Sequence, residues 1–174
     1  CFMEVSSHAI SQCRISGINF TGGVFTNLTQ DHLDYHNSFA EYRDVKKSFF
    51  DLLPKSAFAL TNKDDKNGMK ILERTKAQKC TYSLKSVSDY KCRVLENQFD
   101  GMLLSINKVD IWVKLIGDFN AYNLLSVYAV ANQFAFEDHE VLTALSMLIS
   151  PEGRFQYLQS EEKITAIVDY AHTD

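Results

Sequence analysis

The chain has 174 residues, of which 45% are hydrophobic and 23% are charged, and its formal net charge is −4. This composition is typical of one globular domain with a sizeable core, and it excludes a disordered or fibrous chain. No apolar run approaches the ~20 residues that a membrane-spanning helix needs, and no signal-peptide pattern is present. Because the chain is mildly acidic, we expect no basic face for nucleic acid.

The four cysteines are scattered and form no CxxC pair, so their spacing indicates neither a zinc knuckle nor a redox motif. They are Cys1, Cys13, Cys80 and Cys92. Free thiols suit a reducing compartment, which predicts a cytoplasmic protein. The chain opens at Cys1 without an initiator methionine and continues directly into apolar residues, which predicts a piece of a longer protein.

Four short apolar runs each stop abruptly at a polar cluster, and they cover residues 2–5, 23–28, 57–60 and 166–168. Because helical patterns separate several of these runs, they predict an α/β fold with a layered, mostly parallel sheet flanked by helices. Ligands bind outside the carboxyl ends of the strands in such sheets. Loops after strands are often polar without any function, but four clusters that combine acids, histidines and hydroxyls favour a site.

The best-defined helix begins after Ser38, which forms a capping box with Glu41. Helical spacing places one set of side chains on an apolar face: Tyr42, Lys46, Phe49, Phe50 and Leu53. A second set shares another face: Arg43, Lys47 and Asp51. The pattern therefore places Lys46 in the apolar stripe and Lys47 outside it.

The second half of the chain predicts three strands followed by two helices. The strands cover residues 91–96, 102–106 and 110–115, and turn signals at Asp100-Gly101 and Asn107-Lys108 join them into a small antiparallel meander. The helices cover residues 119–134, with Asp118 as the cap, and residues 137–148.

Two histidines four residues apart stand out in the sequence DHLDYH (residues 31–36). His32 and His36, with acids beside them, are able to bind a divalent metal, as in a metallohydrolase, although the spacing suggests no third ligand. The alternative is a polar loop whose histidines cap nearby elements. No phosphate-binding glycine loop, GxSxG or HExxH motif is present.

Lys46 and Glu4 are charged residues in apolar surroundings. Burial favours the neutral amine of a lysine, which can act as a nucleophile or base or react with carbon dioxide to form a carbamate. The alternative for Lys46 is a side chain that extends to the surface. A buried Glu4 would need a partner or a metal, whereas on an edge strand it would face solvent.

Together these segments resemble the central domain of the Mur ligase family, a P-loop-like α/β domain. The resemblance rests on EVSSH (residues 4–8), FTNLTQDHLDYH (residues 25–36) and the Tyr42-x-x-x-Lys46 pair. It continues, in the same order, through NKDD (62–65), GDFNAYNLL (117–125), GRF (153–155) and DYAHT (169–173). Within the family, the motifs are most similar to the branch that adds the third residue of the peptidoglycan peptide.

The resemblance implies an ATP-dependent amide ligase that joins diaminopimelate or lysine to UDP-N-acetylmuramoyl-L-alanyl-D-glutamate. The substrate carboxylate is phosphorylated by ATP, and the incoming amine then attacks the acyl phosphate. The resemblance also implies two Mg²⁺ ions, one nearer the ATP phosphates held by Glu4 and a second served by His32 and a carbamylated Lys46. It places the UDP-sugar-peptide on Ser6, Gln12 and Arg14, and the nucleotide on Asn120, Asn123, Arg154 and Asp169.

Residues 1–174 then correspond to a partial central domain, without the first strand and phosphate loop, the N-terminal UDP-binding domain or the C-terminal amino-acid-binding domain. We expect this piece alone to be inactive. Two alternatives stay open: another ligase of the superfamily, of the folylpolyglutamate or cyanophycin type, and a non-catalytic paralogue that binds nucleotide or UDP-sugar. No membrane or nucleic-acid partner is expected, and the sequence does not predict an oligomeric state.

Overall fold

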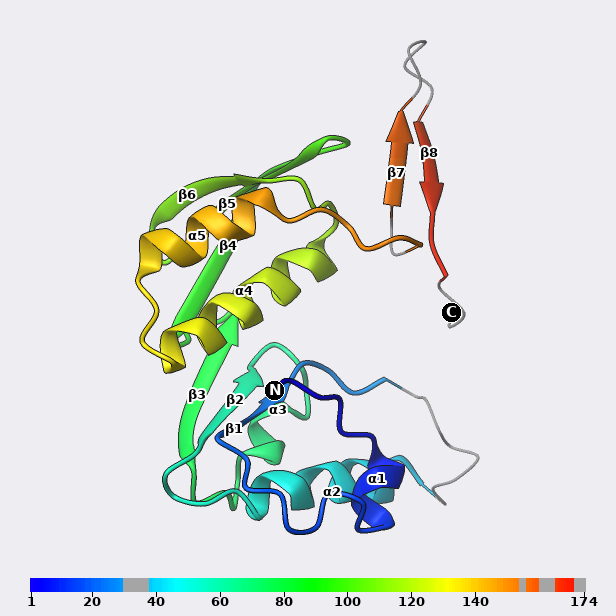
Figure 1. The fold of residues 1–174 in the computed structure, drawn as a ribbon, viewed down its shortest axis with the longest axis vertical. Helices are drawn as coiled ribbons and strands as arrows, with labels where there is room; N and C mark the ends of the chain where they lie inside the picture. The colour runs from blue at the N-terminus through cyan, green and yellow to red at the C-terminus, as the bar shows by residue number, and fades with distance from the viewer. Residues whose placement is uncertain (30–37, 154–155, 160–164, 171–174) are drawn as a thin grey trace. The chain divides into compact units, whose positions relative to one another are not determined.

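The computed structural model describes residues 1–29, 38–153, 156–159 and 165–170. The chain divides into two compact units, Cys1–Lys91 and Cys92–Asp174. No helix within the described residues is long and apolar enough to cross a membrane. The elements are α1 (Ser7–Ser11), β1 (Gly22–Phe25), α2 (Phe39–Asp51), β2 (Phe58–Asn62), α3 (Gly68–Ile71), β3 (Gln78–Ser83), β4 (Tyr90–Gln98), β5 (Gly101–Ile106), β6 (Val109–Val113), α4 (Asp118–Gln133), α5 (Asp138–Met147), β7 (Gln156–Gln159) and β8 (Thr165–Val168) (Figure 1).

Six strands are hydrogen-bonded in the order β1-β2-β3-β4-β5-β6. The pairs from β1 to β4 are parallel, and those from β4 to β6 are antiparallel. The predicted α/β class and the antiparallel meander are therefore confirmed. No strand was expected at β3, because it begins with the polar residues Gln78 and Lys79 and lacks the apolar run of its neighbour β2.

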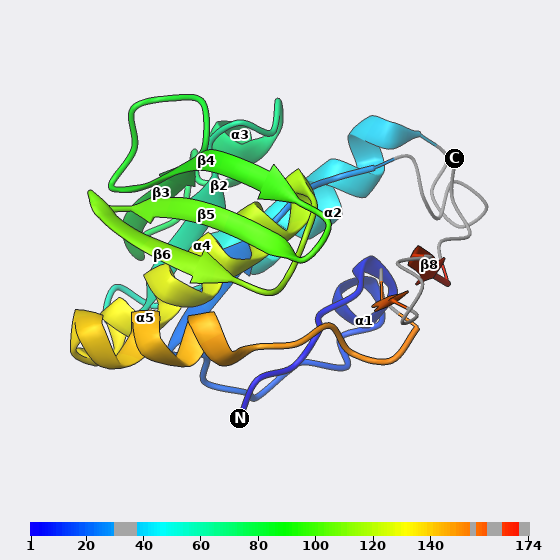
Figure 2. The same ribbon diagram turned by 90° about the horizontal axis from the view of Figure 1, so that it is seen from above.

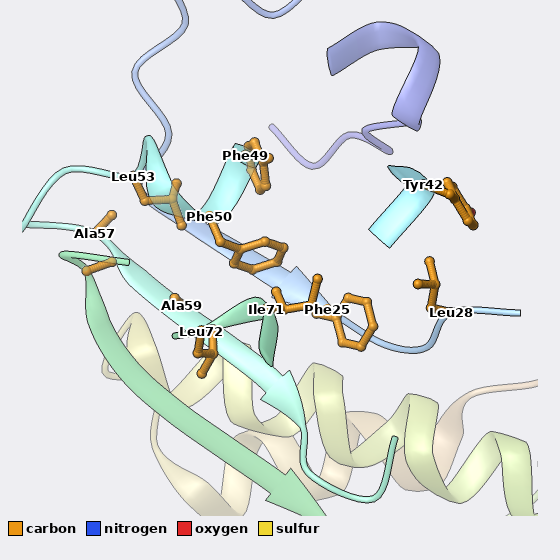
Figure 3. Packing of buried hydrophobic residues seen from close by; sticks show 11 residues of the cluster. Phe25, Leu28, Tyr42, Phe49, Phe50, Leu53, Ala57, Ala59, Ile71 and Leu72 are labelled. Atoms are coloured by element: carbon orange, nitrogen blue, oxygen red, sulfur yellow. The ribbon is translucent and has the colours of Figure 1, made fainter. Parts of the chain in front are cut away.

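The core of the first unit lies between α2 and the strands β1 and β2 (Figure 3). Phe49 and Phe50 from α2, with Leu53 just after the helix, pack toward Phe25 of β1 and Ala59 of β2. The helix begins at Ser38, whose hydroxyl accepts a hydrogen bond from the Glu41 amide at 3.2 Å, as the predicted capping box requires. The predicted apolar face of α2 is the face that covers the sheet.

Gly23 makes the close packing of α2 on β1 possible. A β-carbon at this position would lie 2.8 Å from the Phe49 ring and 3.1 Å from both Leu53 and Phe50. Because glycine has no side chain, these three side chains can approach the strand backbone directly. Gly23 thereby fixes how near α2 lies to the sheet.

The expectation of a strand at residues 2–5 is wrong. Residues 1–6 have no regular secondary structure and lead into α1, and Val5 packs against the core cluster from outside. An apolar run becomes a strand only when a neighbouring strand satisfies its backbone, and none of the described strands pairs with it.

In the second unit, α4 and α5 cover one face of the β4–β5–β6 meander (Figures 1 and 2). Met102, Leu104, Ile106 and Val113 are fully buried on that face. The predicted turn at Asn107-Lys108 joins β5 to β6, and both residues have positive φ, 46° and 74°. This backbone is typical of the two-residue turn that matches the twist of a hairpin.

The two predicted helices of this unit are confirmed, but the predicted cap of the first is wrong. Gly117, with φ of 91°, is the N-cap residue of α4, and Asp118 is its first helical residue. The Gly117 carbonyl accepts the Asn120 amide at 2.9 Å. Asp118 still lies where a negative charge interacts favourably with the helix dipole.

The last predicted strand is also placed differently from the expectation. β8 pairs antiparallel with β7 in a two-stranded sheet, and it is not part of the six-stranded sheet. Of the four apolar runs expected as strands of one sheet, the six-stranded sheet therefore contains only the two that form β1 and β2.

Candidate active site

Lys46 lies on the same face of α2 as the buried residues Tyr42 and Phe49, as its helical spacing predicts. Its Nζ atom is 5.6 Å from the centroid of the Tyr42 ring. Burial of the amine lowers the pKa of Lys46 below its ordinary value of 10.5, and the Glu4 carboxylate partly opposes this shift. Lys46 is thus closer to its neutral, nucleophilic form than a solvated lysine.

Lys47 behaves differently, although it is the next residue. Its Nζ atom forms an ion pair with Asp51, one helical turn later, at 2.9 Å. This pair places an opposite charge beside the Lys47 ammonium, at the (i, i+4) spacing that brings side chains together on a helix. The predicted difference between the two lysines is therefore present in the structure.

Glu4 is exposed, and its carboxylate lies close enough to Lys46 to influence the lysine's pKa electrostatically. The structure thus brings together two of the three residues expected to hold Mg²⁺. The third, His32, lies outside the described residues, as does His36.

Among the described residues, no group of three His, Cys, Asp or Glu side chains forms a metal site. Mg²⁺ prefers oxygen ligands, so Glu4 fits the ion and an unmodified Lys46 ammonium does not. A carbamate on Lys46 would fit, because it replaces a cation with two oxygen atoms. The lowered pKa of Lys46 favours the neutral amine that this modification requires.

The three residues expected to bind the UDP-sugar-peptide lie on α1 and the turn that ends it. Ser6 is the N-cap of α1, and its Oγ accepts the Ala9 amide at 3.1 Å, so its hydroxyl hydrogen remains available as a donor. Gln12 and Arg14 are exposed at the other end of the helix.

The backbone between Gln12 and Arg14 is fixed by a Schellman turn. The Cys13 amide donates to the Ile10 carbonyl at 3.0 Å, and the Arg14 amide donates to the Ala9 carbonyl at 2.9 Å. Cys13 has φ of 55° in the left-handed region, where glycine is usual. This turn directs the chain so that the side chains on both sides of Cys13 are exposed.

The polar cluster after β2 contains Asp64, which the sequence indicated only as part of this cluster and of the family motif NKDD. The Asp64 carboxylate accepts hydrogen bonds from the Ser83 and Ser86 hydroxyls at 2.7 and 2.9 Å and from the Leu84 and Lys85 amides at 2.8 and 3.0 Å. Burial alone would raise the pKa of Asp64, but these hydrogen bonds outweigh it and the net shift is downward. Asp64 therefore joins the end of β2 to the loop after β3.

Three of the four residues expected to contact the nucleotide are in the described part of the second unit. Asn120 and Asn123 lie in the first two turns of α4, where Asn120 Nδ2 donates to the Ile116 carbonyl at 2.8 Å and Asn123 Nδ2 lies 3.4 Å from Asn120 Oδ1. Asp169 is exposed after β8. Arg154 lies outside the described residues.

The family model described as "Mur ligase middle domain" matches residues 1–131. A protein of Phocaeicola vulgatus is 58% identical over 172 residues, which cover 99% of this chain and 36% of the relative. A protein of Cytophaga hutchinsonii is 49% identical over 173 residues, with the same coverage of each chain. Both relatives are named UDP-N-acetylmuramoyl-L-alanyl-D-glutamate–2,6-diaminopimelate ligase. The chain thus spans 36% of the length of these relatives.

Solved structures show the same fold. A ligase with the same name superposes with a TM-score of 0.79 at 29% identity, covering 97% of this chain and 36% of that one. The MurF ligase of Thermotoga maritima in complex with ADP has a TM-score of 0.68 at 15% identity, over 90% of this chain and 36% of that one, and it shows the fold alone. Because the family model matches three quarters of the chain and the relatives match nearly all of it, this chain belongs to the Mur ligase middle-domain family.

Proposed function

We propose that the chain is part of an ATP-dependent ligase that adds 2,6-diaminopimelate to UDP-N-acetylmuramoyl-L-alanyl-D-glutamate in the cytoplasm. The observation that carries this proposal is the 58% identity, over 99% of the chain, to a relative with that name. Support from the geometry is that Lys46 and Glu4, two residues of the expected Mg²⁺ set, lie within electrostatic reach of each other. Residues 1–174 would be a partial central domain of the parent enzyme.

Lys46 would take part after modification. Its neutral amine attacks carbon dioxide, a carbon–nitrogen bond forms, and the amine proton is released to water, which leaves a carbamate. The carbamate and His32 would hold one Mg²⁺ and Glu4 the other, and these ions offset phosphate charge when they are bound. The low pKa of Lys46 makes this chemistry easier than at an ordinary lysine, because the protonated amine is not nucleophilic.

Other residues of the chain would bind the two large substrates. Arg14 supplies a permanent cation for an anionic group of the UDP-sugar-peptide, and Ser6 and Gln12 supply hydrogen bonds beside it. Asn120, Asn123, Arg154 and Asp169 would contact the nucleotide. In the reaction, the substrate carboxylate attacks the γ-phosphate of ATP and ADP leaves; the diaminopimelate amine then attacks the acyl phosphate and inorganic phosphate leaves.

The test is phosphate release by the full parent protein with UDP-N-acetylmuramoyl-dipeptide, ATP and Mg²⁺, with diaminopimelate and lysine supplied separately. Release that requires the sugar-peptide and diaminopimelate would support the proposal. Release that requires the sugar-peptide and lysine, and does not occur with diaminopimelate, would instead identify lysine as the incoming amino acid. A folded parent protein that binds nucleotide without releasing phosphate would refute the proposal and favour the non-catalytic paralogue.

The matched pair Lys46→Met and Lys47→Met tests the role of the carbamate. Loss of a metal ligand should lower activity by more than about 100-fold in Lys46→Met. Lys47→Met should keep activity within about twofold, because it loses only the partly buried ion pair with Asp51 and no expected metal ligand. Equal losses in the two variants would count against Lys46 as a carbamylated ligand.

A further inference from the structure

The turn between β2 and α3 (residues 63–67) contacts both flanks of the segment that carries the DHLDYH sequence. On the first flank, the Leu28 amide donates to Oδ2 of Asp65 at 3.1 Å, and Leu28 is buried just after β1. On the second flank, the Lys66 ammonium lies 5.3 Å from the ring centroid of Phe39, the first residue of α2. Two adjacent residues of one turn therefore hold the chain before residue 30 and after residue 37.

The Asp65 side chain is itself held in place. Its other oxygen, Oδ1, accepts hydrogen bonds from the Asn67 amide at 2.7 Å and from Asn67 Nδ2 at 3.3 Å, and Asn67 is buried. The Gly68 amide donates to the Asp65 carbonyl at 2.9 Å, and a β-carbon on Gly68 would overlap the Asn62 carbonyl oxygen. Because the turn packs this closely on the end of β2, the orientation of Oδ2 toward Leu28 is fixed.

Formation of the turn does not require the contact with Leu28. The hydrogen bonds to Asn67 are local, as in the usual Asx turn, whereas Leu28 is 37 residues away in the sequence. Asp64, the preceding residue, directs its carboxylate to the loop after β3 instead. Asp65 therefore joins the end of β2 to the loop after β1, with a charge-assisted hydrogen bond of the stronger class.

We propose that Asp65 is a positioning residue for the ligase reaction, and that it sets the place of the backbone at Leu28, four residues before His32. This inference rests on the proposed function, which assigns His32 to Mg²⁺. Metal-ligating side chains lose affinity when the groups that orient them are removed. Asp65 would thus act on the reaction through the backbone, without touching a substrate.

On the second flank, ring contacts extend from Lys66 to Lys46, another residue expected to hold Mg²⁺. The Phe39 ring meets the Tyr42 ring edge-on at a centroid distance of 6.3 Å, and Lys46 lies over the opposite end of this pair, on Tyr42. Lys66 is therefore linked through two rings to Lys46. The same turn would influence the chain near His32 through Asp65 and near Lys46 through Lys66.

The experiment uses the full parent protein and compares Asp65→Asn with Asp89→Asn. The Asp89 carboxylate makes a matched contact elsewhere, since its Oδ2 accepts the Thr81 amide at 2.8 Å and the Thr81 hydroxyl at 2.7 Å. Amide hydrogen exchange should become faster at Leu28 in Asp65→Asn alone, and faster at Thr81 in Asp89→Asn alone. Direct Mn²⁺ binding, with Mn²⁺ as the probe for the Mg²⁺ site, should weaken about 10- to 100-fold in Asp65→Asn only.

Steady-state kinetics complete the comparison. In Asp65→Asn, kcat should fall about 10- to 100-fold and more Mg²⁺ should be needed for half-maximal rate, while the KM for the sugar-peptide stays within about twofold. Asp89→Asn should leave kcat, the Mg²⁺ concentration for half-maximal rate and the KM for the sugar-peptide unchanged. Lys66→Ala should lower kcat roughly twofold to fivefold, because an exposed cation–π contact is weaker than the Asp65 bond.

The outcomes separate this inference from the proposed function. Unchanged exchange at Leu28 in an active Asp65→Asn enzyme would overturn the inference alone. Faster exchange at Leu28 with unchanged kcat and Mn²⁺ binding would overturn the positioning role. An inactive wild-type parent would refute the proposed function and with it the catalytic part of the inference, whatever the exchange at Leu28 shows.

Discussion

The ammonium nitrogen of Lys46 lies over the ring of Tyr42, one helical turn earlier on α2, at 5.6 Å from the ring centroid. Tyr42 is only 5% exposed, so the lysine lies along the buried face of the helix. The position of the amine follows directly from the spacing of four residues, which brings side chains onto the same face of a helix.

The lowered pKa of Lys46 predicts a specific dependence of stability on pH. Between the lowered pKa and 10.5, the unfolded chain binds more protons at this residue than the folded chain, so the free energy of unfolding rises with pH. Lys46→Met removes this dependence, whereas Lys47→Met keeps it. Urea unfolding of the three proteins at several pH values from 7 to 10 measures the difference, and identical slopes in all three would contradict the burial of Lys46.

The four cysteines should divide into two classes of reactivity. Cys1 and Cys13 are exposed, whereas Cys80 and Cys92 are buried, and burial raises the pKa of Cys92 to about 12. Because the thiolate is the reactive form, iodoacetamide at pH 8 should label only the exposed pair in the folded protein. All four should react in denaturant. Peptide mass spectrometry identifies the labelled sites, and rapid native labelling of Cys92 would contradict the burial of its thiol.

Gly23→Ala should destabilise the first unit through packing. The added β-carbon would lie 2.8 Å from the Phe49 ring, and overpacking of this kind costs about 1–3 kcal/mol. Phe49→Leu in the same protein should recover part of the loss, which a double-mutant cycle in urea measures.

Gly17→Ala provides the control for this cycle. Gly17 has φ of 82°, and a β-carbon added there would meet no atom within 4 Å, so alanine costs only backbone strain, about 1–2 kcal/mol. Phe49→Leu should not relieve that cost. Equal coupling of Phe49→Leu with both alanines would reject the packing explanation.

Tyr128→Phe should lower the free energy of unfolding by about 1–3 kcal/mol at pH 7, because the Asp138 carboxylate loses a donor. The Tyr128 hydroxyl donates to Asp138 Oδ1 at 2.8 Å and joins α4 to the start of α5. Burial, with help from this hydrogen bond, raises the pKa of Tyr128 to about 12.

The raised pKa of Tyr128 fixes the sign of the pH effect. The contribution of the tyrosine is complete below pH 10, its ordinary pKa, and it is lost as the pH rises toward 12. Wild type and Tyr128→Phe should therefore converge in urea unfolding above pH 10. A constant difference in the free energy of unfolding between the two proteins up to pH 12 would contradict the hydrogen bond from the Tyr128 hydroxyl to Asp138.

Local patterns predicted α2 and the meander well, because a capping residue, a helical stripe and turn residues act over a few positions. Ser38 begins α2 as its capping box indicates, and Asn107-Lys108 forms the turn between β5 and β6. The strand expected at residues 2–5 and the cap expected at Asp118 were wrong, since strand pairing and the exact cap depend on neighbours that the local sequence does not specify.

For the site, the sequence by itself determined which lysine of the pair Lys46-Lys47 lies on the buried face, because helical periodicity alone decides it. It also determined the family through motifs that are distributed along the chain. Only the tertiary structure decided that Glu4 comes near Lys46 and that Asp65, one of the two adjacent acids after β2, bonds to Leu28. The residues of these two pairs lie 42 and 37 positions apart in the sequence. The packing of α2 and the β2–α3 turn on a parallel sheet, which no local pattern encodes, brings them together.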